Sequence, residues 1–288
     1  MERVPICPDS NKTIAEWFDK IGFSGDGVTQ EQIDNTYRFV FTAGQNLDQE
    51  LPVPKDFFEN PTVLAAAELA CQLHQEDRRK VGGDPYFKHP LKTACLCAQL
   101  VRAEDFKQGD LNQYYWEIME AAAFLHDVIE IRRDKDNYNT EQLTKDLIEA
   151  GIEKEKAAAI TYLVNKLTPS SKEEGISPEQ RRREKQEDFL RIMTETCNDW
   201  QGSDKEMMAN ILRLVKVADI LANLEETVAD LPLGRTNGLF AGKPVEYVVG
   251  VVGDRVGYLN ERQDSIPNCA IDRLQIYLNQ LNQLLKRE

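Results

Sequence analysis

Residues 121–130 have the sequence AAAFLHDVIE, in which an apolar run leads directly into a histidine and an aspartate. The run is apolar on every side of a helix, so it predicts the buried centre of a long helix over about 111–130. Burying an imidazole and carboxylates beside such a run is costly unless a strong partner compensates them. On a helix, Glu130 shares a face with His126 four residues earlier. The stretch therefore predicts a helical fold built around a buried polar site.

Only two other histidines exist, His74 and His89, and a further candidate carboxylate stands far downstream at Asp219. Asp219 lies in the run KVADILAN over 216–223, an apolar helical pattern where a lone buried aspartate would need compensation. Neutral imidazoles and carboxylates that converge from separate helices suit a divalent transition metal. By ligand chemistry alone, two histidines and two aspartates suit manganese, iron, cobalt or zinc about equally.

Helical periodicity dominates the rest of the chain, and strand-type alternation is almost absent, so the predicted fold class is all-α. The Val- and Gly-rich stretch 248–253 is compatible with a strand or a helix, and a helix is favoured, with Gly253 and Gly257 allowing close packing. Thr29 to Gln32 forms a capping-box sequence that opens a helix. Beside the long helix, the pattern predicts helices at about 62–79, 90–103, 140–150, 153–167, 178–198, 206–229, 244–260 and 269–287, with a loop at 231–244.

Composition narrows the class of protein. The 288 residues carry a net charge of -14, which disfavours nucleic acid as a partner because phosphate-backbone binding needs a dense basic surface. The six cysteines lack paired metal-binding spacing and are interpreted as reduced core thiols. No apolar run approaches the ~18 residues of a membrane span, and no apolar signal region opens the chain. We expect a cytoplasmic protein without membrane association. The last helix carries an apolar seam that packs either on the body of the chain or on a second subunit in a homo-oligomer, and packing within the chain is the favoured interpretation.

The sequence around His89 adds a family resemblance. Residues 78–90 read RRKVGGDPYFKHP, and together with HDVIE and KVADILAN they resemble the HD-superfamily hydrolase domain of RelA/SpoT-type enzymes and their small stand-alone homologues. These enzymes degrade the alarmone (p)ppGpp. The resemblance covers about 62–228 and includes the order of the motifs. It implies an HD-domain helical bundle over 61–230, with an N-terminal helical extension over 1–60 and C-terminal helices over 231–288 packing on the core.

The resemblance also implies roles for individual residues. The metal ligands would be His89, His126, Asp127 and Asp219, and the metal would be manganese. His74 stays outside this set and is interpreted as a packing or supporting residue.

Glu130 is placed to take a proton from the attacking water. On the substrate side, Arg79 and Lys80 would stack on a guanine base and hold its phosphates. Asn223 would contact the sugar, and Lys216 would supply a cation near the metal. Arg181, Arg182 and Arg183 could close over outer phosphates, although a solvated basic helix face is the better interpretation for at least two of them. Tyr86 is expected to brace its turn and not to touch a ligand.

One position departs from the family pattern. Alarmone hydrolases carry Glu-Asp after the HD pair, whereas this chain has Glu130 followed by Ile131. Isoleucine can neither move protons nor orient water, so the particular reaction on ppGpp is one hypothesis among three. The first is a metal-dependent phosphohydrolase of purine nucleotides with (p)ppGpp as first candidate. The second keeps the chemistry and changes the substrate to a nucleoside monophosphate or NADPH. The third is a catalytically degenerate nucleotide-binding sensor.

Overall fold

The protein is described from a computed structural model, which covers residues 16–23, 28–30, 59–79, 83–101, 112–169, 177–230, 245–261 and 266–286 together with Gln32, Thr36 and Phe57. Within these ranges there is no strand, only one bridge between Arg78 and Pro85. The all-α prediction is therefore confirmed. The described helices with defined bounds are α4 (Pro61–Leu73), α5 (Lys88–Leu100), α6 (Gln113–Leu125), α7 (Val128–Asp136), α8 (Thr140–Glu149), α9 (Lys154–Leu167), α10 (Pro178–Thr194), α11 (Lys205–Asp230), α12 (Val245–Asn260) and α13 (Asn268–Leu285).

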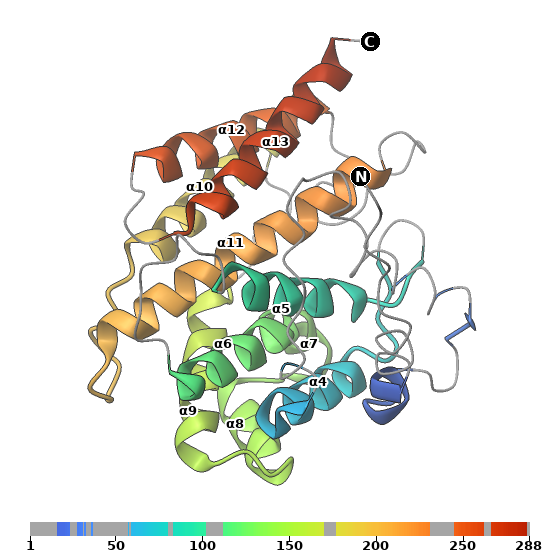
Figure 1. The fold of residues 1–288 in the computed structure, drawn as a ribbon, viewed down its shortest axis with the longest axis vertical. Helices are drawn as coiled ribbons and strands as arrows, with labels where there is room; N and C mark the ends of the chain where they lie inside the picture. Colours follow the sequence, from blue (N-terminus) through green and yellow to red (C-terminus); the bar gives the residue numbers. More distant parts are fainter. Residues whose placement is uncertain are drawn as a thin grey trace, which may run out of the picture.

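The long helix α11 crosses the centre of the fold (Figure 1). α5 and α6 pack on one side of it, while α10 and α13 pack on the other and α12 lies against α13 and α10. α4 and α9 pack on α6, and α8 joins them at the end of the molecule farthest from α13. Leu212, Val215 and Val217 on different sides of α11 are fully buried, as expected of a central helix.

Two polar residues interrupt the long helix predicted over 111–130. α6 ends at Leu125 and α7 begins at Val128, so His126 and Asp127 lie in a turn between two helices and the prediction of one continuous helix was wrong. The Nδ1–H of His126 donates to the carbonyl of Ala123 at 2.8 Å, the group that would accept the amide of residue 127 in an unbroken α-helix. The imidazole thus takes the carbonyl that the next backbone hydrogen bond of the helix would use, and the helix ends there.

The helix predicted over 62–79 was also too long, because α4 ends at Leu73. His74, the next residue, makes two contacts with Asp77. Its carbonyl accepts a hydrogen bond from the Asp77 amide at 2.9 Å, and its ring Nδ1 lies 2.9 Å from the Asp77 carboxylate. These local bonds replace further helical ones and start the loop that leads to α5. The helix predicted over 178–198 was too long as well, because α10 ends at Thr194.

The stretch 248–253 is helical, which confirms the favoured prediction for α12. The packing role assigned to two of its glycines was wrong, because a Cβ built at Gly253 or Gly257 meets nothing within 4 Å. The close approach occurs instead at Gly250, where a Cβ would lie 2.9 Å from the guanidinium of Arg182. A helix that carries three glycines therefore needs only one of them for contact with α10.

The described N-terminal residues pack on the helical core. Trp17 lies against Phe124 with ring centroids 6.2 Å apart, and Phe23 lies against Phe87 at 5.5 Å. The capping box is confirmed by its two reciprocal bonds, from the Thr29 amide to Gln32 Oε1 and from the Gln32 amide to Thr29 Oγ1. The helix predicted to follow it, with Ile33, Tyr37 and Phe41, lies outside the described residues, as does the loop predicted at 231–244.

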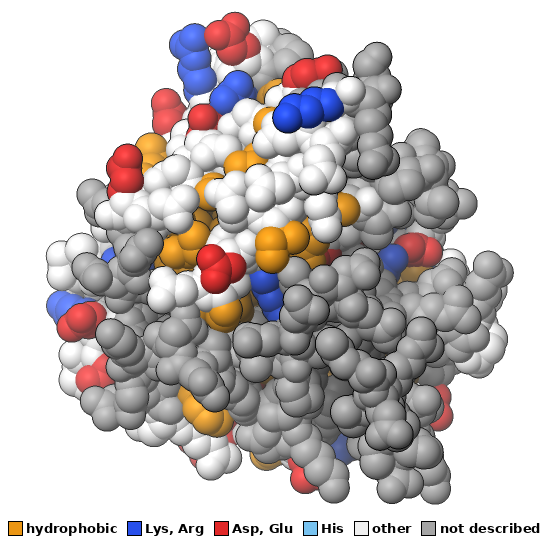
Figure 2. Space-filling model, turned by 45° about the horizontal axis from the view of Figure 1, so that its top comes forward, with side chains coloured by type: hydrophobic (Ala, Val, Ile, Leu, Met, Phe, Trp, Pro, Cys, Tyr) orange, Lys and Arg blue, Asp and Glu red, His pale blue; other side chains and the backbone are white. Residues whose placement is uncertain are grey.

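The last helix buries its apolar seam within the chain. Ile271, Leu274 and Leu281 of α13 are buried, and the helix contacts α11 and α12. Figure 2 shows this end of the molecule, where acidic and basic side chains are interspersed with apolar ones. In the part of the chain that the structure describes, no helix combines the length and apolarity needed to cross a bilayer. The described cysteines are free thiols, in agreement with their interpretation as reduced.

Candidate metal centre

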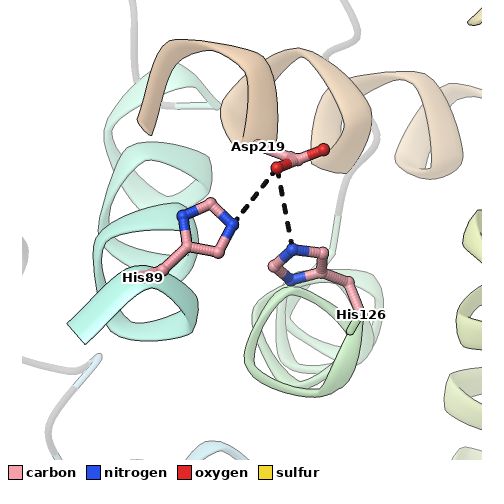
Figure 3. Close-up of side chains that lie close together, drawn as sticks. All are labelled: His89, His126 and Asp219. Atoms are coloured by element: carbon pink, nitrogen blue, oxygen red, sulfur yellow. Dashed lines mark ion pairs between the residues drawn. The ribbon is translucent and has the colours of Figure 1, made fainter. Parts of the chain in front are cut away.

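Two helices and one turn bring the four predicted metal ligands together. His89 is the second residue of α5, and Asp219 lies in the middle of α11. His126 and Asp127 occupy the turn between α6 and α7. The packing of α11 against α5 and α6 places Asp219 opposite both histidines (Figure 3).

The distances within the cluster fit one small cation. The Nε2 atoms of His89 and His126 lie 3.2 and 3.7 Å from Asp219 Oδ1. The same nitrogens lie 3.6 and 3.3 Å from Asp127 Oδ2. Donor atoms that each sit about 2.0–2.2 Å from a shared ion are about 3–3.5 Å apart in adjacent positions. His89, His126 and Asp219 could therefore hold a divalent metal, with the Asp127 carboxylate beside them.

The orientation of the imidazoles supports this interpretation. Because the backbone carbonyl of Ala123 can only accept, Nδ1 of His126 carries a proton, and Nε2 is the ring nitrogen directed at the cluster. That Nε2 is buried and has no hydrogen-bond partner among the described residues. The His89 ring is 3 % exposed and meets the His126 ring edge-on at 5.2 Å. A buried ring nitrogen that makes no hydrogen bond and faces two carboxylates is suited to bind a metal ion.

The electrostatics of the cluster favour a bound cation. Burial would raise the pKa of the Asp219 carboxyl, but Lys216 and His89 hold it well below its usual range. Burial would likewise raise the pKa of the Asp127 carboxyl, but the neighbouring His126 holds that pKa well below its usual range. Burial works to lower the pKa of His126, yet the charges of Asp127 and Asp219 raise it to about 9. Two ionised carboxylates thus draw positive charge into the cluster, and a divalent ion would displace the proton from His126.

Tyr86 supports the cluster from the loop before α5. Its hydroxyl donates to Asp127 Oδ2 at 2.6 Å, and its ring packs on His74 with centroids 4.9 Å apart. Asp77 holds His74 and also pairs with Lys135 of α7. His74 is therefore a buried support for Tyr86, in line with its interpretation as a packing or supporting residue. Sequence reasoning missed the bond from Tyr86 to Asp127, although the tyrosine stands in the same motif as His89.

Glu130 and Ile131 lie in the first turns of α7, directly after the metal-site turn. Both side chains are half-buried. The charge of Glu130 contributes to the raised pKa of Tyr86, after burial and the Asp127 carboxylate, which places Glu130 close to the cluster. The position that carries aspartate in alarmone hydrolases is therefore occupied by an apolar side chain beside a carboxylate.

The predicted substrate residues of α11 contact the cluster itself. Lys216 Nζ lies 3.1 Å from Asp219 Oδ2, and Asn223 Nδ2 donates to Asp219 Oδ1 at 2.7 Å. Positions 216, 219 and 223 share one face of the helix, so their convergence follows from helical spacing. In the structure both side chains hold the Asp219 carboxylate in place.

The predicted base-binding pair is only partly visible. Arg79 is 6 % exposed, pairs with the buried Glu226 and packs over the Tyr86 ring at 5.2 Å. Lys80 lies outside the described residues. Arg79 is thus already neutralised by the chain, a feature that the sequence motif alone does not reveal.

The arginines of α10 point in different directions. Arg182 pairs with Asp254 of α12 at 2.7 Å, and the exposed Arg183 pairs with Glu179 on its own helix at 3.3 Å. The side chain of Arg181 lies outside the described part. Arg183 thus lies on a solvated face, whereas Arg182 is held against α12, and neither contacts the metal cluster.

Comparison with known proteins assigns the central segment to a class. Residues 86–224 match the family model described as the HD domain. The matched segment contains His89, His126, Asp127 and Asp219. The match begins at Tyr86, so Arg79 and Lys80 precede it. Neither a curated protein nor a solved structure matches the chain.

Proposed function

We propose that the chain is a metal-dependent phosphohydrolase of a purine nucleotide, with removal of the 3'-pyrophosphate of (p)ppGpp as the first candidate reaction. The observation that carries the proposal is the buried cluster of two imidazoles and two carboxylates within an HD domain. The (p)ppGpp assignment rests on the resemblance of residues 78–90 to the alarmone branch. The cluster has the mixed nitrogen and oxygen donors that manganese accepts, and manganese is the proposed cofactor.

His89, His126, Asp127 and Asp219 would hold the metal, which when bound supplies Lewis acidity toward a phosphate oxygen and water. Tyr86, Lys216 and Asn223 fix the orientation of the two carboxylates through the contacts described above. Glu130 is the general base that takes the proton of the attacking water. Lys216 also offers a positive charge to the phosphate oxygens as negative charge develops on them.

A second candidate keeps this chemistry and changes the nucleotide to a nucleoside monophosphate or NADPH. Ile131 favours it, because a half-buried isoleucine follows Glu130 where the alarmone enzymes have a second carboxylate. The placement of Arg79 points the same way, since its guanidinium already packs over the Tyr86 ring and base stacking would compete with that contact.

The experiment measures phosphate and pyrophosphate released from ppGpp, a nucleoside monophosphate and NADPH with added manganese. The wild type is compared with Asp127→Ala and with Asp146→Ala, a control whose carboxylate accepts from Tyr138 in the α7–α8 region. Pyrophosphate release from ppGpp that only Asp127→Ala loses would support the first candidate. Release of phosphate from another nucleotide alone would support the second. Absence of any release with manganese bound would contradict both and favour the sensor hypothesis.

A further inference from the structure

Arg255 is a buried cation that neither the motifs nor the HD match accounts for. It lies in α12, is 3 % exposed, and stacks on the ring of Phe189 in α10 at 5.4 Å. Its Nε and Nη1 atoms are buried and have no hydrogen-bond partner among the described residues. The contact with Phe189 engages the face of the guanidinium, whereas Nε and Nη1 on its edge make no hydrogen bond to the described residues.

The surroundings of Arg255 connect it to the metal centre. After burial, which lowers its pKa, the largest influence on Arg255 is the negative charge of Asp219. Asp188, Tyr247 and Asp254 contribute in the same direction. Arg255 in turn opposes the raised pKa of Lys216, so the two cations are close enough to repel each other beside the cluster.

This arrangement is costly unless a ligand uses it. A buried donor without a partner costs about 1–3 kcal/mol, and more when it is charged. Arg255 is 3 % exposed, so its guanidinium is enclosed by the protein and does not lie on the surface. By contrast, the buried Arg79 has a carboxylate partner, Glu226.

We infer that Arg255, together with Lys216, forms a phosphate-binding subsite beside Asp219, so that the C-terminal helix α12 contributes to substrate binding. The planar guanidinium presents parallel N–H groups that match two oxygens of one phosphate, and an ammonium adds a point charge. Phe189 fixes the plane of that guanidinium. The inference rests on the proposed function, because it assigns the group that binds a phosphate of the nucleotide next to the metal.

The test is calorimetric titration of inorganic phosphate into the manganese-loaded full chain. We compare wild type, Arg255→Met and Arg255→Lys with Arg273→Met, a matched control. Arg273 is a buried arginine of α13 that donates to Gln99 at 3.3 Å. We expect Arg255→Met to bind phosphate about tenfold or more weakly, since hydrogen bonds to charged groups are lost. Arg255→Lys should be intermediate, and Arg273→Met should match wild type within about twofold.

Thermal melting of the same proteins separates binding from folding. Because Arg255 is buried with unused donors, Arg255→Met should melt no lower than wild type. The inference is overturned if the wild type does not bind phosphate, or if Arg255→Met binds it as tightly as wild type. It is also overturned if Arg255→Met fails to fold while Arg255→Lys has wild-type affinity.

Nucleotide turnover on these proteins keeps the two proposals distinguishable. If phosphate binding depends on Arg255 but no nucleotide is hydrolysed, the proposed function fails and the subsite stands. If a nucleotide is hydrolysed and Arg255→Met retains wild-type phosphate affinity, the subsite fails and the proposed function stands.

Discussion

The metal cluster and the cations around it are held in opposite ways. In the cluster, His126 presents a buried Nε2 without a hydrogen bond toward two ionised carboxylates. Of the cations predicted to bind substrate, Arg79 is paired with Glu226 and Lys216 with Asp219. The cluster is therefore arranged to receive a further group, whereas these two cations already have partners within the chain. The difference indicates that the cluster has donor atoms for a cation, and that Arg79 would have to leave Glu226 to bind a substrate, whereas Lys216 already lies beside the cluster.

The largest expected effect is on the turnover rate, through the carboxylate of Glu130 next to the metal cluster. Glu130→Gln removes the proposed base while keeping the shape of the side chain, so kcat should fall about 10²–10⁴-fold. Manganese and nucleotide affinities should stay within about twofold of wild type, because glutamine loses only the proton-accepting function. Steady-state kinetics and calorimetry measure both. Glu141→Gln, on exposed α8, is the control. An unchanged kcat would show that Glu130 is not the base.

The second prediction concerns Arg79. Arg79→Met leaves Glu226 buried without its partner and should lower the free energy of unfolding by about 3–5 kcal/mol. The double variant Arg79→Met/Glu226→Met should recover most of that loss, because no unpaired charge remains. Urea unfolding measures these values. A loss of nucleotide affinity in Arg79→Met without any loss of stability would contradict the view that Arg79 is held structurally.

The third prediction tests the support of the cluster. Tyr86→Phe removes the hydroxyl that donates to Asp127 Oδ2, so manganese affinity should fall about 10–100-fold. Tyr138→Phe removes a similar hydroxyl, which donates to Asp146 at 2.7 Å away from the site, and should leave that affinity unchanged. Metal titration by calorimetry compares the two. Equal affinities would mean that Asp127 needs no orientation by Tyr86.

The smallest predicted effect is on stability and concerns Asp77, which holds His74 against Tyr86. The hydrogen bond from His74 is the main cause that lowers the pKa of Asp77 to about 2, with Lys135 assisting against burial. A lowered folded-state pKa adds stability above the unfolded value, about 3.9, and this stability is lost as the pH falls through about 2. Its size is about 2 kcal/mol.

Urea unfolding of wild type and Asp77→Asn at decreasing pH checks this. The difference between the two proteins should be largest near neutral pH and shrink between about pH 4 and about pH 2. A difference that does not change over that range would show that the Asp77 charge contributes nothing, and that only its shape matters.

The ligand positions were largely predictable from sequence, and the contacts around them were not. His126, Asp127 and Asp219 could be found because polar residues stand out in apolar helical patterns, whereas the choice of His89 over His74 rested on the family resemblance. Asp219, Lys216 and Asn223 share a face through spacing alone. The break between α6 and α7 was missed because it depends on the His126 imidazole bonding to a backbone carbonyl. The early end of α4 likewise depends on the bond between His74 and Asp77.

Contacts between distant segments carry no local signal in one sequence. The partner of Arg79 is Glu226, 147 residues away, and nothing near either residue indicates the pair. Arg255 had a faint signal, as a cation within the apolar run of 248–259, but its approach to Lys216 depends on how α12 packs on α10 and α13. Tertiary packing therefore decides which cations remain available to a substrate.

Direct measurement of bound manganese tests the central claim that the cluster is a metal centre. Wild type and His126→Ala are dialysed against manganese, and the metal per chain is determined by elemental analysis, with circular dichroism to confirm that both are folded. The account predicts one tightly bound ion per wild-type chain and loss of that ion in folded His126→Ala. Wild type without stoichiometric metal, or His126→Ala that retains it, would contradict the account.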